Sequence, residues 1–165
     1  MPNRTRKLHN QPAGGRAAEL AAGLKAAGLR LTPQRLAMCE ALGGSRSHPT
    51  AQSLYGQLRP AFPSLSRATV YNTLQALVKA GLIDELGGAG DGASHYDAHP
   101  APHVNLVCTR CHRVEDFMNA PLEAVAQRVS VDSGYELRGA RVVYYGLCPR
   151  CQRELRKASG GKRGA

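Results

Sequence analysis

Apolar residues in the first half of the chain recur at helical spacing, between residues that typically cap and end helices. We expect one helix over residues 16–27, where Ala and Leu dominate, and Gly28 ends it. Three more helices are expected to follow the cap residues Thr32, Thr50 and Ser66, and to end at Gly43, Pro60 and Gly81. The inward positions predicted for these three helices are Leu36, Leu42, Leu54, Leu58, Val70, Leu74, Leu77 and Val78.

A short apolar run follows the fourth helix and leads into a glycine-rich turn. Residues 82–86 and 94–97 read as the two strands of a hairpin, with the turn over 87–92. Helices followed by such a hairpin are typical of a winged helix-turn-helix domain.

The second half has a different pattern, which begins after a hinge marked by Pro100 and Pro102. Strands are expected over 104–107 and 141–147. Between them a helix is expected to start at Pro121 and to carry Leu122, Val125 and Val129. The fold class is therefore α+β: a winged-helix domain joined by a hinge to a small α/β domain.

The predicted organisation has five parts. They are a disordered basic arm (1–15), a winged-helix DNA-binding domain (16–97), a hinge (98–102), a dimerisation and metal-binding domain (103–153) and a disordered basic tail (154–165).

Charge supports a nucleic-acid partner for the first half. The chain has 22 Lys and Arg against 12 Asp and Glu, a net charge of +10. Basic residues are in excess in both tails and over residues 19–83, whereas acidic residues are in excess over 84–152. A basic balance indicates a polyanionic partner. Aromatic residues are only 5% of the chain and Trp is absent, which argues against a stacking platform for single strands.

The sequence has no run of about 18 apolar residues, as a membrane span needs, and no apolar signal core near its start. We therefore expect a cytoplasmic protein without a membrane partner. Five cysteines in that compartment favour metal ligands or free thiols over disulfides.

The start of the fourth predicted helix has the character of a DNA reader. Its apolar face leaves Arg67, Tyr71, Asn72 and Gln75 pointing away from the core. Arg can donate two hydrogen bonds to guanine, and Asn or Gln can pair with adenine. The expected reading segment, Ser66 to Asn72, includes Thr69. An ordinary amphipathic helix with a solvated polar face is the alternative.

Four cysteines form two CxxC pairs: Cys108 with Cys111, and Cys148 with Cys151. Two such turns supply the four thiolates of a closed tetrahedral site, so we expect structural Zn²⁺. Cys39 has no such partner in the sequence and is expected to be a small buried hydrophobe.

Histidines and aspartates provide a second candidate metal site. The ligands proposed from the sequence are His48, Asp97, His103 and Asp116, with His95, His99 and Asn105 as further candidates. Mixed imidazole and carboxylate ligands suit iron, manganese or zinc. Because His48 lies in the predicted winged-helix domain and His103 lies beyond the hinge, an ion joining them would fix the angle between the domains.

Several motifs together resemble the ferric uptake regulator superfamily. They are residues 31–35 (LTPQR), 48–51 (HPTA), 68–72 (ATVYN), 114–117 (VEDF) and 145–151, with His103 five residues before the first CxxC. The resemblance covers about residues 19–153. It implies a homodimeric, metal-dependent transcriptional repressor that binds double-stranded operator DNA. It also implies zinc at the four cysteines and a regulatory metal at the positions His48, Asp97, His103, Asn105 and Asp116. Arg30 resembles a basic family position that approaches the minor groove.

Within the superfamily, Asp97 and Asp116 resemble the peroxide-sensing branch. That resemblance implies regulatory Fe²⁺ or Mn²⁺, and His48 and His103 as the histidines that peroxide oxidises. Asn105 is a departure, since the family usually has histidine there, and its oxygen favours manganese or ferrous iron over zinc. The alternative within the family is a manganese- or iron-uptake regulator without peroxide sensing.

Two alternatives come from other classes. A hydrolytic metalloenzyme would use His48, His103 and Asp116, but the sequence has no His-Glu-x-x-His pattern or comparable motif, and we do not expect an enzyme. A zinc-stapled interaction domain would bind no DNA at all, and a mobility-shift experiment would distinguish it.

Overall fold

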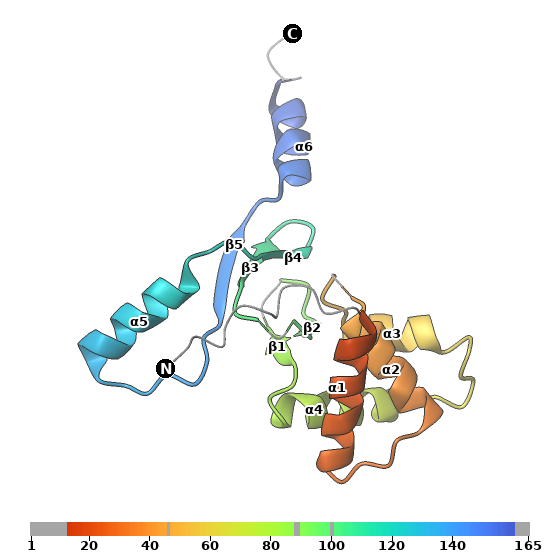
Figure 1. Ribbon diagram of the computed structural model, residues 1–165. Helices are drawn as coiled ribbons and strands as arrows, with labels where there is room; N and C mark the ends of the chain where they lie inside the picture. Colours follow the sequence, from red (N-terminus) through yellow and green to blue (C-terminus); the bar gives the residue numbers. More distant parts are fainter. Residues whose placement is uncertain (1–12, 46, 88–89, 100, 161–165) are drawn as a thin grey trace. The chain divides into compact units, whose positions relative to one another are not determined.

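The computed structural model describes residues 13–45, 47–87, 90–99 and 101–160. They divide into two compact units, which we treat separately. The first unit contains helices α1 to α4 and strands β1 and β2, and the second contains β3, β4, α5, β5 and α6 (Figure 1).

Three of the four helices of the first unit begin after the cap residues that the sequence predicts. The four helices are α1 (Ala13–Ala26), α2 (Pro33–Gly43), α3 (Ala51–Leu58) and α4 (Arg67–Lys79). The side chain of Thr32 accepts a hydrogen bond from the backbone of Arg35 at the start of α2. Ser66 accepts one from the backbone of Thr69 at 3.0 Å and so caps α4. These caps satisfy backbone N–H groups that a helix end otherwise leaves without a partner.

The core of the first unit is made mainly of leucines from all four helices. Its fully buried members include Leu20, Leu24, Leu42, Leu54, Val70, Leu74 and Leu77. The prediction for Leu36 was wrong: it is 40% exposed, because Met38 and Cys39 fill the inner face of α2 instead. Thr73 is buried without being predicted, since its hydroxyl donates to the carbonyl of Thr69 at 2.7 Å within the helix.

Strands β1 (Asp84–Leu86) and β2 (His95–Asp97) form the predicted antiparallel hairpin of the wing. The turn predicted over 87–92 includes residues 88–89, which lie outside the described part of the chain. β2 also contacts the segment before α3. The N–H of Tyr96 donates to the carbonyl of Pro49 at 3.0 Å, and Thr50 and His95 form an isolated antiparallel β-bridge.

The second unit is built on a three-stranded sheet of order β4-β3-β5 (Figure 1). β3 (Val104–Cys108) and β5 (Val142–Gly146) were predicted and pair in parallel. β4 (Val114–Phe117) was not predicted as a strand, and it pairs antiparallel with β3. Helix α5 (Leu122–Ser133) follows Pro121 as expected, but it has no buried residue.

The ends of the folded part extend further than predicted. Helix α1 begins at Ala13, inside the expected arm, and the rest of that arm lies outside the described residues. Helix α6 (Pro149–Gly160) continues through most of the expected tail. Arg150 and Glu154 form an i,i+4 ion pair at 3.7 Å on α6, and such pairs favour the helix. Among the described residues, no helix is long and apolar enough to cross a membrane.

Candidate metal centres

The four CxxC cysteines meet at one end of the second unit's sheet. Cys108 ends β3, and its neighbour across the parallel pairing is Gly146, the last residue of β5. The chain then delivers Cys148 to the same end, and Cys151 follows in the first turn of α6. All four sulfur atoms lie within 4.8 Å of one another, and the Cys111 and Cys148 sulfurs are 3.7 Å apart.

This geometry fits a tetrahedral zinc ion. Zinc–sulfur bonds of about 2.3 Å in a tetrahedron place the sulfurs about 3.8 Å apart, near the separation of the Cys111 and Cys148 sulfurs. The expected four-cysteine cluster is therefore present, and its donor set is closed to further ligands and suits structural zinc.

Backbone groups favour thiolates at part of the cluster. The N–H of Cys148 donates to the Cys108 sulfur at 3.4 Å. This N–H, with those of Cys111 and Arg110, lowers the pKa of Cys108 to about 5. Burial and the neighbouring sulfurs raise the pKa of Cys151 to about 12. Four thiolates together therefore require a bound cation to offset their mutual repulsion.

Hydrogen bonds around the cysteines tie the two CxxC turns together. Arg110 donates to the carbonyl of Cys151 at 3.1 Å and forms an ion pair with Glu154 at 3.3 Å. The N–H of Thr109 donates to the carbonyl of Gly146 at 2.8 Å. The first turn of α6 is thus fixed to the turn that follows β3, which orients the ligands.

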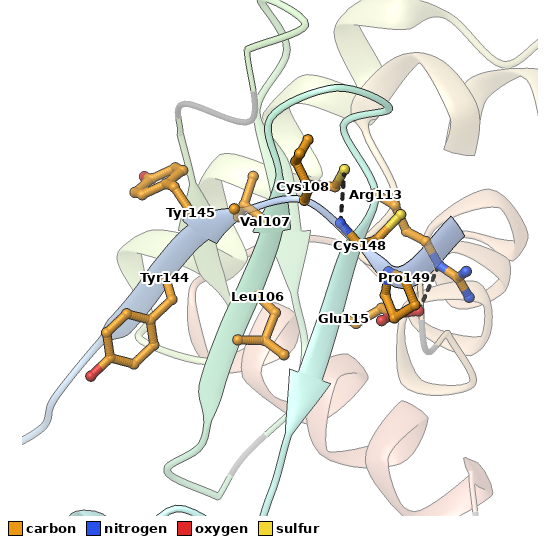
Figure 2. A pocket seen from close by; sticks show the side chains of 11 residues that line it. Leu106, Val107, Cys108, Arg113, Glu115, Tyr144, Tyr145, Cys148 and Pro149 are labelled. Atoms are coloured by element: carbon orange, nitrogen blue, oxygen red, sulfur yellow. Dashed lines mark hydrogen bonds and ion pairs between the residues drawn. The ribbon is translucent and has the colours of Figure 1, made fainter. Parts of the chain in front are cut away.

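An apolar pocket opens beside the cysteine cluster (Figure 2). Leu106 of β3 and Tyr144 and Tyr145 of β5 line it, with Cys108 and Cys148 at one end. Tyr144 is 63% exposed, and its strand, β5, lies at one edge of the sheet. The second unit therefore presents apolar side chains that it does not itself cover.

Two candidate ligands of the second metal site meet in the first unit. His48 Nε2 and Asp97 Oδ1 are 3.7 Å apart, and both residues are buried. The backbone of His48 has a positive φ of 48°, a conformation that non-glycine residues rarely adopt. The ring of His95 donates through Nδ1 to the carbonyl of His48 at 2.9 Å, which supports that conformation.

Three further candidates meet in the second unit. Asn105 on β3 lies directly opposite Asp116 on β4, so both side chains project from the same face of the sheet. His103, just before β3, brings its Nε2 to 3.3 Å from Asp116 Oδ1. Asn105 is buried, and its side-chain oxygen accepts no hydrogen bond from any described residue. An oxygen in that state is suited to a cation.

The remaining histidine candidates have other contacts. His95 uses one ring nitrogen on the backbone of His48, as described above. His99 is exposed, and its backbone N–H donates to Asp97 Oδ1 at 2.8 Å, which orients that carboxylate. Both residues therefore support the neighbouring candidate ligands in this structure.

Cys39 is separate from both metal centres. It is buried in the first unit, and burial together with Glu40 raises the pKa of its thiol to about 11. Its contacts are those of the core cluster, which fits a small buried hydrophobe.

The predicted DNA-reading face is open to solvent. Arg67, Tyr71, Asn72 and Gln75 are all exposed on α4, and Tyr71 is 51% exposed. Arg30 is also exposed. Sequence reasoning missed that Gln52 and Tyr55 of α3 contact Arg67, because periodicity within one helix carries no information about side chains that meet between helices.

The sequence of this chain is similar to those of known metal-responsive regulators. The model of the ferric uptake regulator family matches residues 26–145. The peroxide-responsive repressor of Staphylococcus epidermidis is 37% identical over 136 residues, which make up 82% of this chain and 90% of that protein.

Solved structures are similar as well. The peroxide stress regulator of Campylobacter jejuni has a TM-score of 0.66 at 28% identity and covers 81% of this chain and 97% of its own. A zinc-bound manganese uptake regulator has a TM-score of 0.59 at 29% identity, covering 81% and 98%. The match of the family model over most of the chain, with the four-cysteine cluster, shows that the chain belongs to the ferric uptake regulator family.

Proposed function

We propose that this protein is a metal-dependent, sequence-specific DNA-binding repressor that responds to hydrogen peroxide. The observation that carries the proposal is the presence of buried donor groups on each unit: His48 with Asp97 on the first, and His103 with Asn105 and Asp116 on the second. Its peroxide-responsive relative supports the choice of signal.

Each set of donors is too small to complete a metal's coordination shell. Two donors lie on the first unit and three on the second, whereas Mn²⁺ and Fe²⁺ take five or six ligands. One ion shared by both sets would reach five. Metal binding would then fix the winged helix relative to the second unit, which is how the ion would control DNA binding.

The donor types favour manganese or ferrous iron over zinc. The five proposed ligands offer two imidazole nitrogens and three oxygens, and Asn105 supplies the oxygen that distinguishes this chain from the histidine usual in the family. His95 and His99 are proposed as supports of His48 and Asp97, with direct ligation as the alternative.

The proposed response to peroxide rests on the two histidine ligands. Ferrous iron, when bound, would supply the one-electron chemistry that breaks the O–O bond of hydrogen peroxide. In the net reaction peroxide would oxidise the ring of His48 or His103 by two electrons: one oxygen would be inserted into a ring C–H bond and the other would leave as water. An oxidised imidazole is a weaker ligand, so the site would loosen and the protein would release DNA.

The proposed DNA contacts are Arg30, Ser66, Arg67, Thr69, Tyr71 and Asn72. The helix start supplies backbone N–H groups for phosphate, and the exposed side chains supply donors for base edges. We expect two copies of the protein to bind one operator as a dimer. The exposed Tyr144 and Val125 give the second unit an apolar surface on which a second copy would pack.

Mobility shifts on DNA from upstream of the protein's own gene test the proposal. We expect the zinc-containing dimer, purified anaerobically, to bind with Mn²⁺ or Fe²⁺ and to release after peroxide only in the iron form. Mass spectrometry should find one added oxygen on His48 or His103. Tyr71→Ala should weaken binding about tenfold at unchanged zinc content, with Lys79→Ala as the control at the far end of α4.

A manganese- or iron-uptake regulator is the second candidate function. The similarity of the chain to a manganese uptake regulator supports this candidate. It would use the same ligands. Binding of the iron form that survives peroxide, without added oxygen on either histidine, would support this candidate and contradict peroxide sensing.

A further inference from the structure

The first residue of the DNA-reading helix is held by side chains of α3. The guanidinium carbon of Arg67 lies 5.1 Å from the centroid of the Tyr55 ring, and one of its nitrogens donates to the side-chain oxygen of Gln52. Arg59 lies 5.8 Å from the same ring and donates to the Tyr55 hydroxyl at 2.9 Å and to the carbonyl of Leu65 at 3.1 Å. We call Gln52, Tyr55, Arg59 and Arg67 the Tyr55 cluster.

The two arginines of the cluster have different surroundings. Arg59 spans from α3 to the segment just before α4, through its bonds to Tyr55 and Leu65. It therefore acts on the position of the ring and of the helix start. Arg67 is exposed at the first position of α4. A guanidinium has five N–H donors. Among the described residues, Gln52 accepts one hydrogen bond from the Arg67 guanidinium.

The Tyr55 ring and a hydrogen bond together restrict the Arg67 guanidinium. A cation over an aromatic ring is attracted to the ring face, and the bond to Gln52 limits how far the guanidinium can turn there. An exposed arginine normally samples many rotamers and loses that freedom on binding. Here the Arg67 side chain is partly ordered before DNA binds, which reduces the entropy cost of a contact that requires a fixed orientation of the guanidinium.

We propose that Gln52 and Tyr55 are positioning residues that hold Arg67 to read a guanine in the major groove. The inference rests on the proposed DNA binding and adds a base class and the residues that determine it. A guanine presents O6 and N7 in one plane and is recognised by two parallel N–H bonds, so the orientation of the guanidinium matters. A phosphate accepts hydrogen bonds from many directions and needs no such arrangement.

Selection of duplexes from a random library by the full-length, zinc- and manganese-loaded protein tests this. The wild type should select a guanine at one position of each half-site. Arg67→Ala should reduce the preference for that guanine at least tenfold, the size of a good bidentate contact. Gln52→Ala and Tyr55→Leu should each reduce it about three- to tenfold, because Arg67 then has to be ordered on binding.

Salt dependence separates a base contact from a phosphate contact. We expect Arg67→Ala to leave the slope of log K against log salt nearly unchanged, whereas loss of a phosphate contact lowers its magnitude by about 0.9. Tyr55→Phe keeps the ring and should retain the guanine preference, which controls for folding. Lys79→Ala removes one charge at the other end of α4 and should leave the preference unchanged.

Uniform weakening on all sequences in Arg67→Ala, with a reduced salt slope, would make Arg67 a phosphate anchor and overturn the inference. An unchanged guanine preference in Arg67→Ala, or in both Gln52→Ala and Tyr55→Leu, would also overturn it, while the proposed function would stand. If the wild type selects no sequence, the proposed function fails, and this inference fails with it.

Discussion

The two units bury their apolar side chains in different ways. In the first, leucines from four helices form one core, and the proposed DNA-reading residues stand on its outer surface. Among the described residues of the second, the buried apolar side chains are few: Val104, Val107, Val114 and the cysteines Cys108 and Cys151. Its helix α5 buries no residue at all. We therefore expect the first unit to be stable by its own packing and the second to depend on bound zinc for its stability.

Loss of zinc should have the largest effect and should fall on the second unit alone. We expect Cys148→Ser to abolish zinc binding and to yield a monomer in which β3, β5 and α6 no longer fold together. A structural zinc contributes on the order of 10 kcal/mol to such small domains. Zinc analysis, sedimentation and hydrogen exchange measure the outcome, with Cys39→Ser as the control that keeps zinc. A stable, zinc-free dimer would show that the cysteines are not structural.

A cavity in the leucine core should affect the first unit alone. Leu74 is fully buried, so Leu74→Ala should cost about 2–5 kcal/mol of its free energy of unfolding and leave the zinc content unchanged. Val131→Ala on α5, where the side chain is 74% exposed, should cost less than about 0.5 kcal/mol in the monomer. Denaturant titrations followed by helical signal measure both. Equal costs would mean that the units do not differ as described.

Asn105 offers a test of the proposed regulatory metal site. Asn105→His should raise zinc affinity at the regulatory site relative to manganese, because imidazole replaces an oxygen donor. Asn105→Ala should lower manganese affinity at least tenfold, since even residues behind the ligands have effects of that size. Competition titrations on protein already loaded with structural zinc give both values. Identical affinities in all three proteins would remove Asn105 from the ligand set.

The smallest expected effect concerns Cys39 and pH. Burial raises the pKa of this thiol from its ordinary value near 9 to about 11, so the folded state holds its proton more tightly than the unfolded chain. Cys39 should add nothing to the pH dependence of stability below about pH 8, and should lower stability as pH rises from about 9 to 11. Iodoacetamide should label Cys39 only after unfolding. Labelling in the native protein at pH 8 would contradict its burial.

Much of the fold was predictable because its determinants are local. Thr32, Thr50 and Ser66 cap helices through atoms within three residues, and the CxxC spacing brings two ligands into one turn. The candidate ligands of both metal sites were proposed as residue types, but the sequence did not reveal that Asn105 faces Asp116, because β4 has no clear alternation of polar and apolar residues.

The errors and omissions come from packing and contacts that the spacing of residue types does not reveal. Leu36 fits the helical spacing of α2, but Met38 and Cys39 occupy the buried face of that helix and Leu36 is exposed. The Tyr55 cluster joins residues from two helices, and no pattern within either helix predicts it. The end of α6 looks like a charged tail by composition, but its first turn is held by the cysteine cluster and the Arg110–Glu154 ion pair.

The separation of the two CxxC turns along the chain has a consequence for how the second unit is held together. Cys108 and Cys148 are 40 positions apart, and the segment that joins β4 to β5 includes an exposed stretch over 134–141. A metal bound by both CxxC turns closes this long loop, whose closure entropy must be overcome before the ion gains its last two ligands. The ion therefore becomes a non-covalent cross-link: a chain cut within 134–141 should stay in one piece on a native gel and separate only when a chelator removes the metal.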